Sequence, residues 1–140
     1  MKKSLQKFLV FASLIVLIFP ALVACGGPQT VDAELTEDYQ INLSTTTMKA
    51  GEITFNIQNT STDLEHEFVI VKTDLAPADM PLNDDGDVDE DQITVVDEQE
   101  AIQAGESATL TVNLDPGHYV IMCNLPGHFA QGMHIEITVQ

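Results

Sequence analysis

Residues 119–133 read Tyr-Val-Ile-Met-Cys-Asn-Leu-Pro-Gly-His-Phe-Ala-Gln-Gly-Met, and this stretch carries the sharpest pattern in the chain. A thiol, an imidazole and a thioether follow one another at intervals of five residues, as Cys123, His128 and Met133. The Pro126-Gly127 pair can turn the backbone sharply, so Cys123 and His128 can converge on one point while Met133 approaches from another side. We therefore predict that this loop supplies three ligands to one metal ion.

The rest of the chain alternates apolar and polar residues in short runs that turn residues separate. A period of two is typical of half-buried antiparallel strands, and no stretch shows a long helical period. About seven or eight such strands in one domain over residues 31–140 predict an all-β fold, a Greek-key β-sandwich. The runs that alternate are 31–35, 39–43, 53–57, 66–70, 108–114, 119–123 and 135–139.

His66 is the best upstream candidate for a further donor to the metal. Its parity with Phe68 and Ile70 places it on the inward face of its strand. A buried imidazole needs a partner, and a metal ion supplies one. Two histidines, a thiolate and a weak thioether suit copper in both oxidation states, because sulfur favours Cu(I) while imidazole accepts Cu(II). Zinc prefers a closed tetrahedron without thioether, and an iron–sulfur cluster needs more cysteines.

Residues 119–140 resemble the copper loop of the cupredoxins. The Cys-x-x-Pro-Gly-His core is similar to azurins, and the Cys-x4-His-x4-Met spacing is similar to rusticyanins and auracyanins. The resemblance implies a type 1 blue-copper protein that carries single electrons and is not an enzyme. The ligands that it implies for one copper ion are His66, Cys123, His128 and Met133. One neighbour departs from the family, because Glu67 follows the first histidine where many cupredoxins have an asparagine that ties the two ligand loops together.

Other histidines and sulfur atoms have simpler interpretations. His118 follows a turn and is expected at the surface, while His134 and Met122 alternate away from the ligand face. Cys123 with His128 could also form a nucleophile and base, but no third, orienting partner is evident. Two other functions stay open, namely copper storage or delivery, and a metal-free β-sandwich for adhesion or scaffolding.

Residues 72–92 interrupt the strand pattern with two prolines and an acidic run from Asp84 to Asp91. The run resembles a calcium loop, but with Gly86 at the sixth position an EF-hand would need carboxylates where Pro81 and Gln92 stand. We predict an exposed acidic insertion with a short helical turn. Adventitious calcium binding there stays open.

The N-terminus has the features of an export signal. Three lysines precede an apolar run, and residues 22–25 read Leu-Val-Ala-Cys, which resembles a bacterial lipobox. We predict a signal peptide over residues 1–24, a lipidated Cys25 with a short linker over 25–30, and an extracytoplasmic location on a membrane. An uncleaved transmembrane anchor is the alternative. With Cys25 lipidated, Cys123 is an unpaired thiol in an oxidising compartment, which metal ligation would explain.

The charge excludes one class of partner. Without residues 1–24, two lysines stand against 22 carboxylates, a formal charge of −20, and no arginine occurs. Nucleic acid is therefore not an expected partner. Such a field would steer basic redox proteins, and acidic residues at 84–91 and 97–100 are candidates for that role. We expect a monomer that docks such partners through an apolar collar of Leu125, Pro126 and Phe129 around His128.

Overall fold

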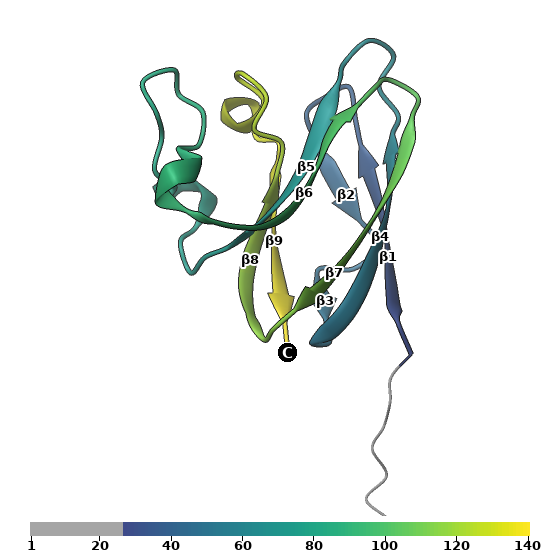
Figure 1. The fold of residues 1–140 in the computed structure, drawn as a ribbon. Coiled ribbons are helices and arrows are strands. Elements are labelled where there is room, and N and C mark those ends of the chain that lie inside the picture. Colours follow the sequence, from purple (N-terminus) through teal and green to yellow (C-terminus); the bar gives the residue numbers. More distant parts are fainter. Residues whose placement is uncertain (1–26) are drawn as a thin grey trace, which may run out of the picture.

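The computed structural model describes residues 27–140, which form two β-sheets packed face to face (Figure 1). The predicted signal peptide and Cys25 lie outside the described residues. Within residues 27–140, no helix is long and apolar enough to cross a bilayer. The strands are β1 (Gln29–Leu35), β2 (Ile41–Leu43), β3 (Thr47–Met48), β4 (Gly51–Asn59), β5 (His66–Lys72), β6 (Thr94–Ile102), β7 (Ser107–Leu114), β8 (Gly117–Met122) and β9 (His134–Val139). Three short 3-10 turns complete the fold: η1 (Pro77–Asp79), η2 (Glu90–Gln92) and η3 (Phe129–Gln131).

The predicted all-β sandwich is confirmed, although its pairing is mixed. One sheet has the order β2-β1-β4-β7 and the other the order β3-β9-β8-β5-β6. We expected antiparallel strands, but β1 pairs in parallel with β4 and β3 pairs in parallel with β9. The alternation within one strand reports which face is buried and carries no information on the direction of the neighbour. That expectation was therefore wrong at these two pairs.

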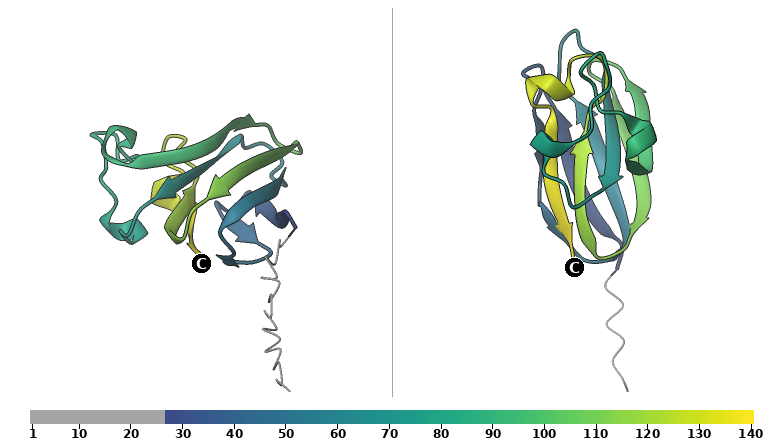
Figure 2. Two further views of the ribbon diagram at one scale, coloured as in Figure 1. Left: turned by 60° about the horizontal axis from the view of Figure 1, so that its bottom comes forward. Right: turned by 90° about the vertical axis from the view of Figure 1, so that its left-hand side faces the viewer.

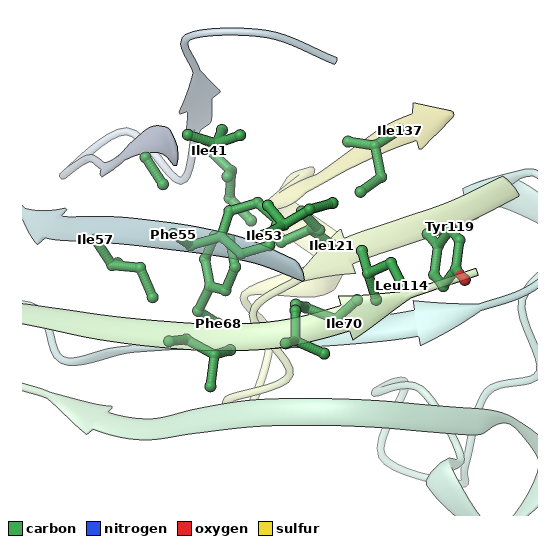
Figure 3. Packing of buried hydrophobic residues seen from close by; sticks show 14 of the residues in the cluster. Ile41, Ile53, Phe55, Ile57, Phe68, Ile70, Leu114, Tyr119, Ile121 and Ile137 are labelled. Carbon is green, nitrogen blue, oxygen red and sulfur yellow. The ribbon is translucent and has the colours of Figure 1, made fainter. Parts of the chain in front are cut away.

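The core lies between the sheets and consists of the residues that alternate inward. Phe55 of β4 and Phe68 of β5 meet across it, with ring centroids 5.2 Å apart and planes inclined by 53° (Figure 3). Each fully buried side chain of this size contributes roughly 1.5–3 kcal/mol relative to exposure. The fully buried large side chains are Tyr119, Phe55, Phe68, Leu35, Met48, Ile53, Ile57, Ile70, Leu114, Ile121, Met122 and Met133.

Strand β6 was not among the runs that the sequence indicated. Among residues 27–140 it pairs with β5 alone, at the edge of the sheet, and the register with β5 shifts twice. Its residues alternate between half-buried and exposed, and most of them are polar or acidic. Acidic side chains and irregular register blunt a sheet edge against pairing with other chains. Such a strand therefore lacks the apolar alternation by which strands are recognised.

The acidic insertion, predicted over residues 72–92, spans residues 73–93 between β5 and β6 and is only partly exposed. The expected helical turns are present as η1 and η2. However, Met80 and Val88 are buried in a second apolar cluster on the outer face of the five-stranded sheet, and Asp87 is buried as well. The insertion lies on the same side of the molecule as the loop that contains η3 (Figure 2). The prediction of an exposed insertion is thus wrong for these three residues, which are buried.

Candidate metal centre

Three of the predicted ligands converge at one end of the sandwich. His66 opens β5, Cys123 directly follows β8, and His128 immediately precedes η3. Because β5 and β8 are antiparallel neighbours, the start of β5 lies near the end of β8. Within residues 27–140, these are the only three His, Cys, Asp or Glu side chains whose ligand atoms gather within 4.8 Å of one another. The acidic run of the insertion forms no comparable group among the described residues.

The donor atoms form a nearly isosceles triangle. Nδ1 of His66 and Nδ1 of His128 are 3.3 Å apart, and Sγ of Cys123 lies 3.3 Å from Nδ1 of His128 and 4.0 Å from Nδ1 of His66. A point in their plane lies about 2.1 Å from all three atoms, which is within the roughly 2.0–2.3 Å that first-row metals such as zinc keep from imidazole and thiolate. Two imidazoles and a thiolate are borderline and soft ligands. The donor set and its spacing therefore fit a copper ion.

The orientation of His66 is set by the turn between β1 and β2. Nε2 of His66 lies 3.1 Å from the carbonyl oxygen of Thr36. A carbonyl can only accept, so Nε2 carries the hydrogen and Nδ1 keeps its lone pair for a metal. Burial lowers the pKa of His66, the neighbouring His128 lowers it further, and the Thr36 carbonyl opposes both effects. His66 is therefore held as a neutral ligand of fixed tautomer.

Cys123 is fully buried, and its sulfur accepts a hydrogen bond from the Glu67 backbone N–H at 3.3 Å. Burial raises the pKa of this thiol to about 11, while the N–H groups of Glu67 and Leu125 counteract the rise and the carboxylates of Glu67 and Glu65 add to it. In the metal-free protein Cys123 is accordingly a neutral thiol at neutral pH. A positive ion at the site would reverse this preference, because metal ions bind the thiolate.

The loop that carries the other ligands closes on itself through backbone hydrogen bonds. The N–H of Cys123 donates to Met133 at 3.0 Å, and the N–H of Met133 donates to His128 at 3.1 Å. Gly127 and Gly132 have φ of +79° and +94°, which residues with a Cβ adopt at a cost. Met133 is fully buried at the end of this loop, and backbone hydrogen bonds join it to both of the other ligands in the loop, Cys123 and His128. His66, Cys123, His128 and Met133 are thus placed to form a single-copper site.

Two residues that contact the ligands were not found from the sequence. Thr36 holds His66 as described, and Tyr39 packs edge-on against His128 with ring centroids 5.0 Å apart and planes inclined by 75°. Tyr39 has a φ of +58°, which is strained for a residue with a side chain. Both residues belong to the β1–β2 turn, and no local motif marks them. The sequence pattern places Tyr39 in the alternating run 39–43, but β2 begins only at Ile41, so Tyr39 lies in the turn before the strand.

The neighbour that departs from the cupredoxin pattern, Glu67, is half-buried beside the site. Burial raises the pKa of its carboxyl, and the carboxylates of Glu90, Glu98 and Glu100 raise it further, while the Asn124 N–H counteracts them. These glutamates come from η2 and β6. The two acidic segments that the sequence indicated therefore lie near each other, close to one ligand.

The residues that we expected outside the ligand set do lie outside it. His118 is half-buried, 3.4 Å from a carboxylate oxygen of Glu136, and Met122 is buried in the outer cluster. His134 packs on Phe129, with ring centroids 5.0 Å apart. Phe129 is itself only 7% exposed and belongs to the outer cluster, so it adds little to a docking surface. Leu125 is half-buried and Pro126 is exposed beside His128.

A two-sheet sandwich with two histidines, a cysteine and a buried methionine at one end defines a small copper-binding β-protein. Residues 30–140 match the model of the copper binding proteins of the plastocyanin/azurin family, and the chain belongs to that family. A search of curated proteins finds no match.

Solved structures of the same fold include two auracyanins and an azurin. Auracyanin from Roseiflexus castenholzii is 26% identical, with a TM-score of 0.61, covering 82% of this chain and 99% of its own. Auracyanin A from Chloroflexus aurantiacus, a "blue" copper protein, is 21% identical, with a TM-score of 0.60. That match covers 81% of this chain and 100% of the auracyanin A chain. The azurin Az-iso2 from Methylomonas sp. strain J is 18% identical, with a TM-score of 0.57. That match covers 81% of this chain and 99% of the azurin chain.

Proposed function

We propose that this chain is a blue-copper electron carrier, anchored outside the cytoplasm, that shuttles single electrons between redox proteins. The observation that carries the proposal is the triangle of His66, Cys123 and His128 at bonding distance from one point, with the buried Met133 joined to Cys123 and His128 by backbone hydrogen bonds. Bound there, copper supplies a one-electron Cu(I)/Cu(II) couple. The protein is then a carrier and not an enzyme.

The ligands are held on rigid supports, which favours electron transfer over metal delivery. His66 and Cys123 stand at the ends of paired strands of one sheet, and His66 is fixed by the Thr36 carbonyl. The loop to Met133 is closed by its own backbone hydrogen bonds. A site that is already arranged before the metal arrives moves little when the charge at its centre changes. A delivery protein needs ligands that open more readily.

His128 offers the route for electrons between the metal site and a redox partner. Cys123 and His66 are both 0% exposed, whereas His128 is half-buried beside the exposed Pro126 and the half-buried Leu125. Apolar surface around this histidine lets a partner approach at little desolvation cost. We therefore place docking at Leu125 and Pro126, whereas the buried Phe129 adds little to this surface.

Charge and anchoring complete the proposal. The acidic segments of the insertion and β6 approach each other near Glu67, so they form one negative region at the side of the site. That region would attract partners with basic docking surfaces. Lipidation of Cys25 would keep the domain on a membrane, and the protein would act there as a monomer.

The test is to load the purified domain without residues 1–24 with Cu(II) and record its visible spectrum. We expect an intense blue charge-transfer band that ascorbate bleaches and that is lost in Cys123→Ala. Repeated cycling in the presence of a Cu(I) chelator then separates the alternatives, because a carrier retains its copper and a delivery protein surrenders it. The absence of a blue band would refute the electron-carrier proposal and favour a metal-free scaffold. Globomycin-sensitive processing and loss of membrane association in Cys25→Ala would test the anchor.

A further inference from the structure

Asp87 is the only buried carboxylate among residues 27–140, with 8% of its surface exposed. A buried charge is costly unless hydrogen bonds compensate for it. Its Oδ1 accepts the backbone N–H of Gly127 at 2.8 Å. Gly127 directly precedes the ligand His128, so a residue of the acidic insertion holds the backbone beside the metal site.

The hairpin that presents Asp87 is itself well ordered by hydrogen bonds. Oδ1 of Asn83 accepts the backbone N–H groups of Asp85 and Asp87 at 2.9 and 3.0 Å. The N–H of Asn83 donates to the carbonyl of Asp87 at 2.8 Å, and Leu82 forms an antiparallel bridge with Val88. The carboxylate of Asp87 is thus delivered by a closed turn and not by a freely moving loop.

A second tie joins the same hairpin to the other side of the metal loop. Asn124 follows the ligand Cys123, and its Oδ1 accepts the Val88 N–H at 2.8 Å while its Nδ2 donates to the Val88 carbonyl at 3.0 Å. The same amide donates to the Glu90 carboxylate at 2.8 Å. One side chain therefore satisfies both backbone groups of Val88, as a neighbouring strand would.

Apolar packing fixes the hairpin to the sheet. Val88 and Met80 are buried in the outer cluster together with Phe129, the residue after His128. The other buried members of that cluster are Val69, Val71, Val120 and Met122. The insertion and the metal loop consequently share one small core, so a displacement of the hairpin displaces the loop.

We propose that Asp87 is a positioning residue for copper, which holds His128 in place through Gly127 while Asn124 and Val88 hold the backbone beside Cys123. In many cupredoxins the asparagine after the first histidine ties the ligand loops, and Glu67 stands at that position here. The insertion supplies the missing tie from outside the sandwich. The inference rests on copper binding at the site and is independent of electron carriage.

The test compares three variants by amide hydrogen exchange of the metal-free protein and by the rate of copper loss to a chelator. In Asp87→Ala we expect Gly127 exchange, measured relative to the core amide of Ile70, to accelerate about tenfold or more, because a hydrogen bond to a charged acceptor is lost. Copper loss should accelerate by about the same factor, and the copper hyperfine splitting in the electron paramagnetic resonance spectrum should change. Asp87→Asn keeps an oxygen acceptor and should stay within about threefold of wild type. Asp84→Ala removes an exposed carboxylate of the same hairpin and should have no effect.

Three results would overturn the proposal. The first is wild-type Gly127 exchange and copper loss in Asp87→Ala. The second is a lower unfolding temperature with an unchanged exchange ratio and unchanged copper spectrum, which would make Asp87 merely structural. Should Asp87→Ala fail to fold, Asn124→Ala tests the second tie against the exposed control Asn113→Ala. In that case, native Val88 exchange together with native copper retention would overturn it.

Discussion

The buried thiol predicts that copper binding releases one proton per ion near neutral pH. Burial raises the pKa of Cys123 to about 11, so at pH 7 only about one molecule in ten thousand carries the thiolate before metal binds. Binding needs the thiolate, and the displaced proton must leave. The apparent affinity for Cu(I) should therefore rise about tenfold for each pH unit between pH 7 and pH 9.

The two histidines determine the pH below which the copper affinity depends more steeply on pH. Burial lowers the pKa values of both His66 and His128, so the two imidazoles stay neutral at pH 7 and release no further proton there. Below that lowered range protons compete for them as well, and the slope should steepen toward three protons per ion. Acidification therefore weakens binding in two stages, first through the thiol and then through the imidazoles.

The assay is an anaerobic Cu(I) titration against a chelator of known pH-dependent affinity, with proton release followed by an indicator in weak buffer. Cys123→Ser is the matched control, because a serine hydroxyl does not ionise in this pH range. Copper added to this variant should therefore release no proton from position 123. Stoichiometric copper binding without proton release, or an affinity that is flat from pH 7 to pH 9, would show that the thiol is already ionised. Burial would then not control the ionisation of Cys123.

Three further outcomes follow from the structure. Asn59 is fully buried, and its side-chain amide donates to the carbonyls of Leu64 and Ile102 at 2.8 Å. Asn59→Ala should therefore lower the free energy of unfolding, measured in urea titrations, by about 2–4 kcal/mol. The exposed control Asn113→Ala should lower it by less than about 0.5 kcal/mol. Ala101 has a φ of +51°, so Ala101→Gly should raise the stability by about 0.5–1 kcal/mol, and a decrease in the thermal midpoint would contradict the strain. Electron exchange with a small basic redox protein should slow about tenfold or more between 10 and 300 mM salt, whereas a rate that does not respond to salt would exclude electrostatic steering.

The metal loop could be predicted from sequence because its chemistry is local. Cys123, His128 and Met133 occur within one short segment, and three such donors at regular spacing rarely occur together without a metal to bind. His66 is distant in sequence, but its strand parity indicated the inward face, and the structure places its Nδ1 beside the other donors. Alternation likewise indicated the sandwich, because burial on one face of a strand leaves a period of two.

The supports of the site could not be predicted, because they depend on which segments meet in space. Thr36 acts through its carbonyl, a group that every residue has, and so leaves no mark in the sequence. The contact of Asp87 with Gly127 joins positions 40 residues apart, and an aspartate within an acidic run looks like a solvated one. The edge strand β6 lacked apolar alternation because most of its side chains alternate only between half-buried and exposed, so one face of the strand need not be apolar.

The direction of β1 determines how the metal site is oriented when the protein is attached to a surface by its N-terminal end. Since β1 runs from Gln29 toward Thr36, which contacts His66, the N-terminal end of the described chain and the metal site lie at opposite poles of the sandwich (Figure 1). The strand between them is about 23 Å long at the usual rise per residue. A molecule attached to an electrode or a bilayer at its N-terminal end therefore turns the exposed edge of His128 toward the solution. The body of the sandwich then insulates the metal from the surface that holds it, and current reaches that surface only through a diffusing partner or by the domain tipping over.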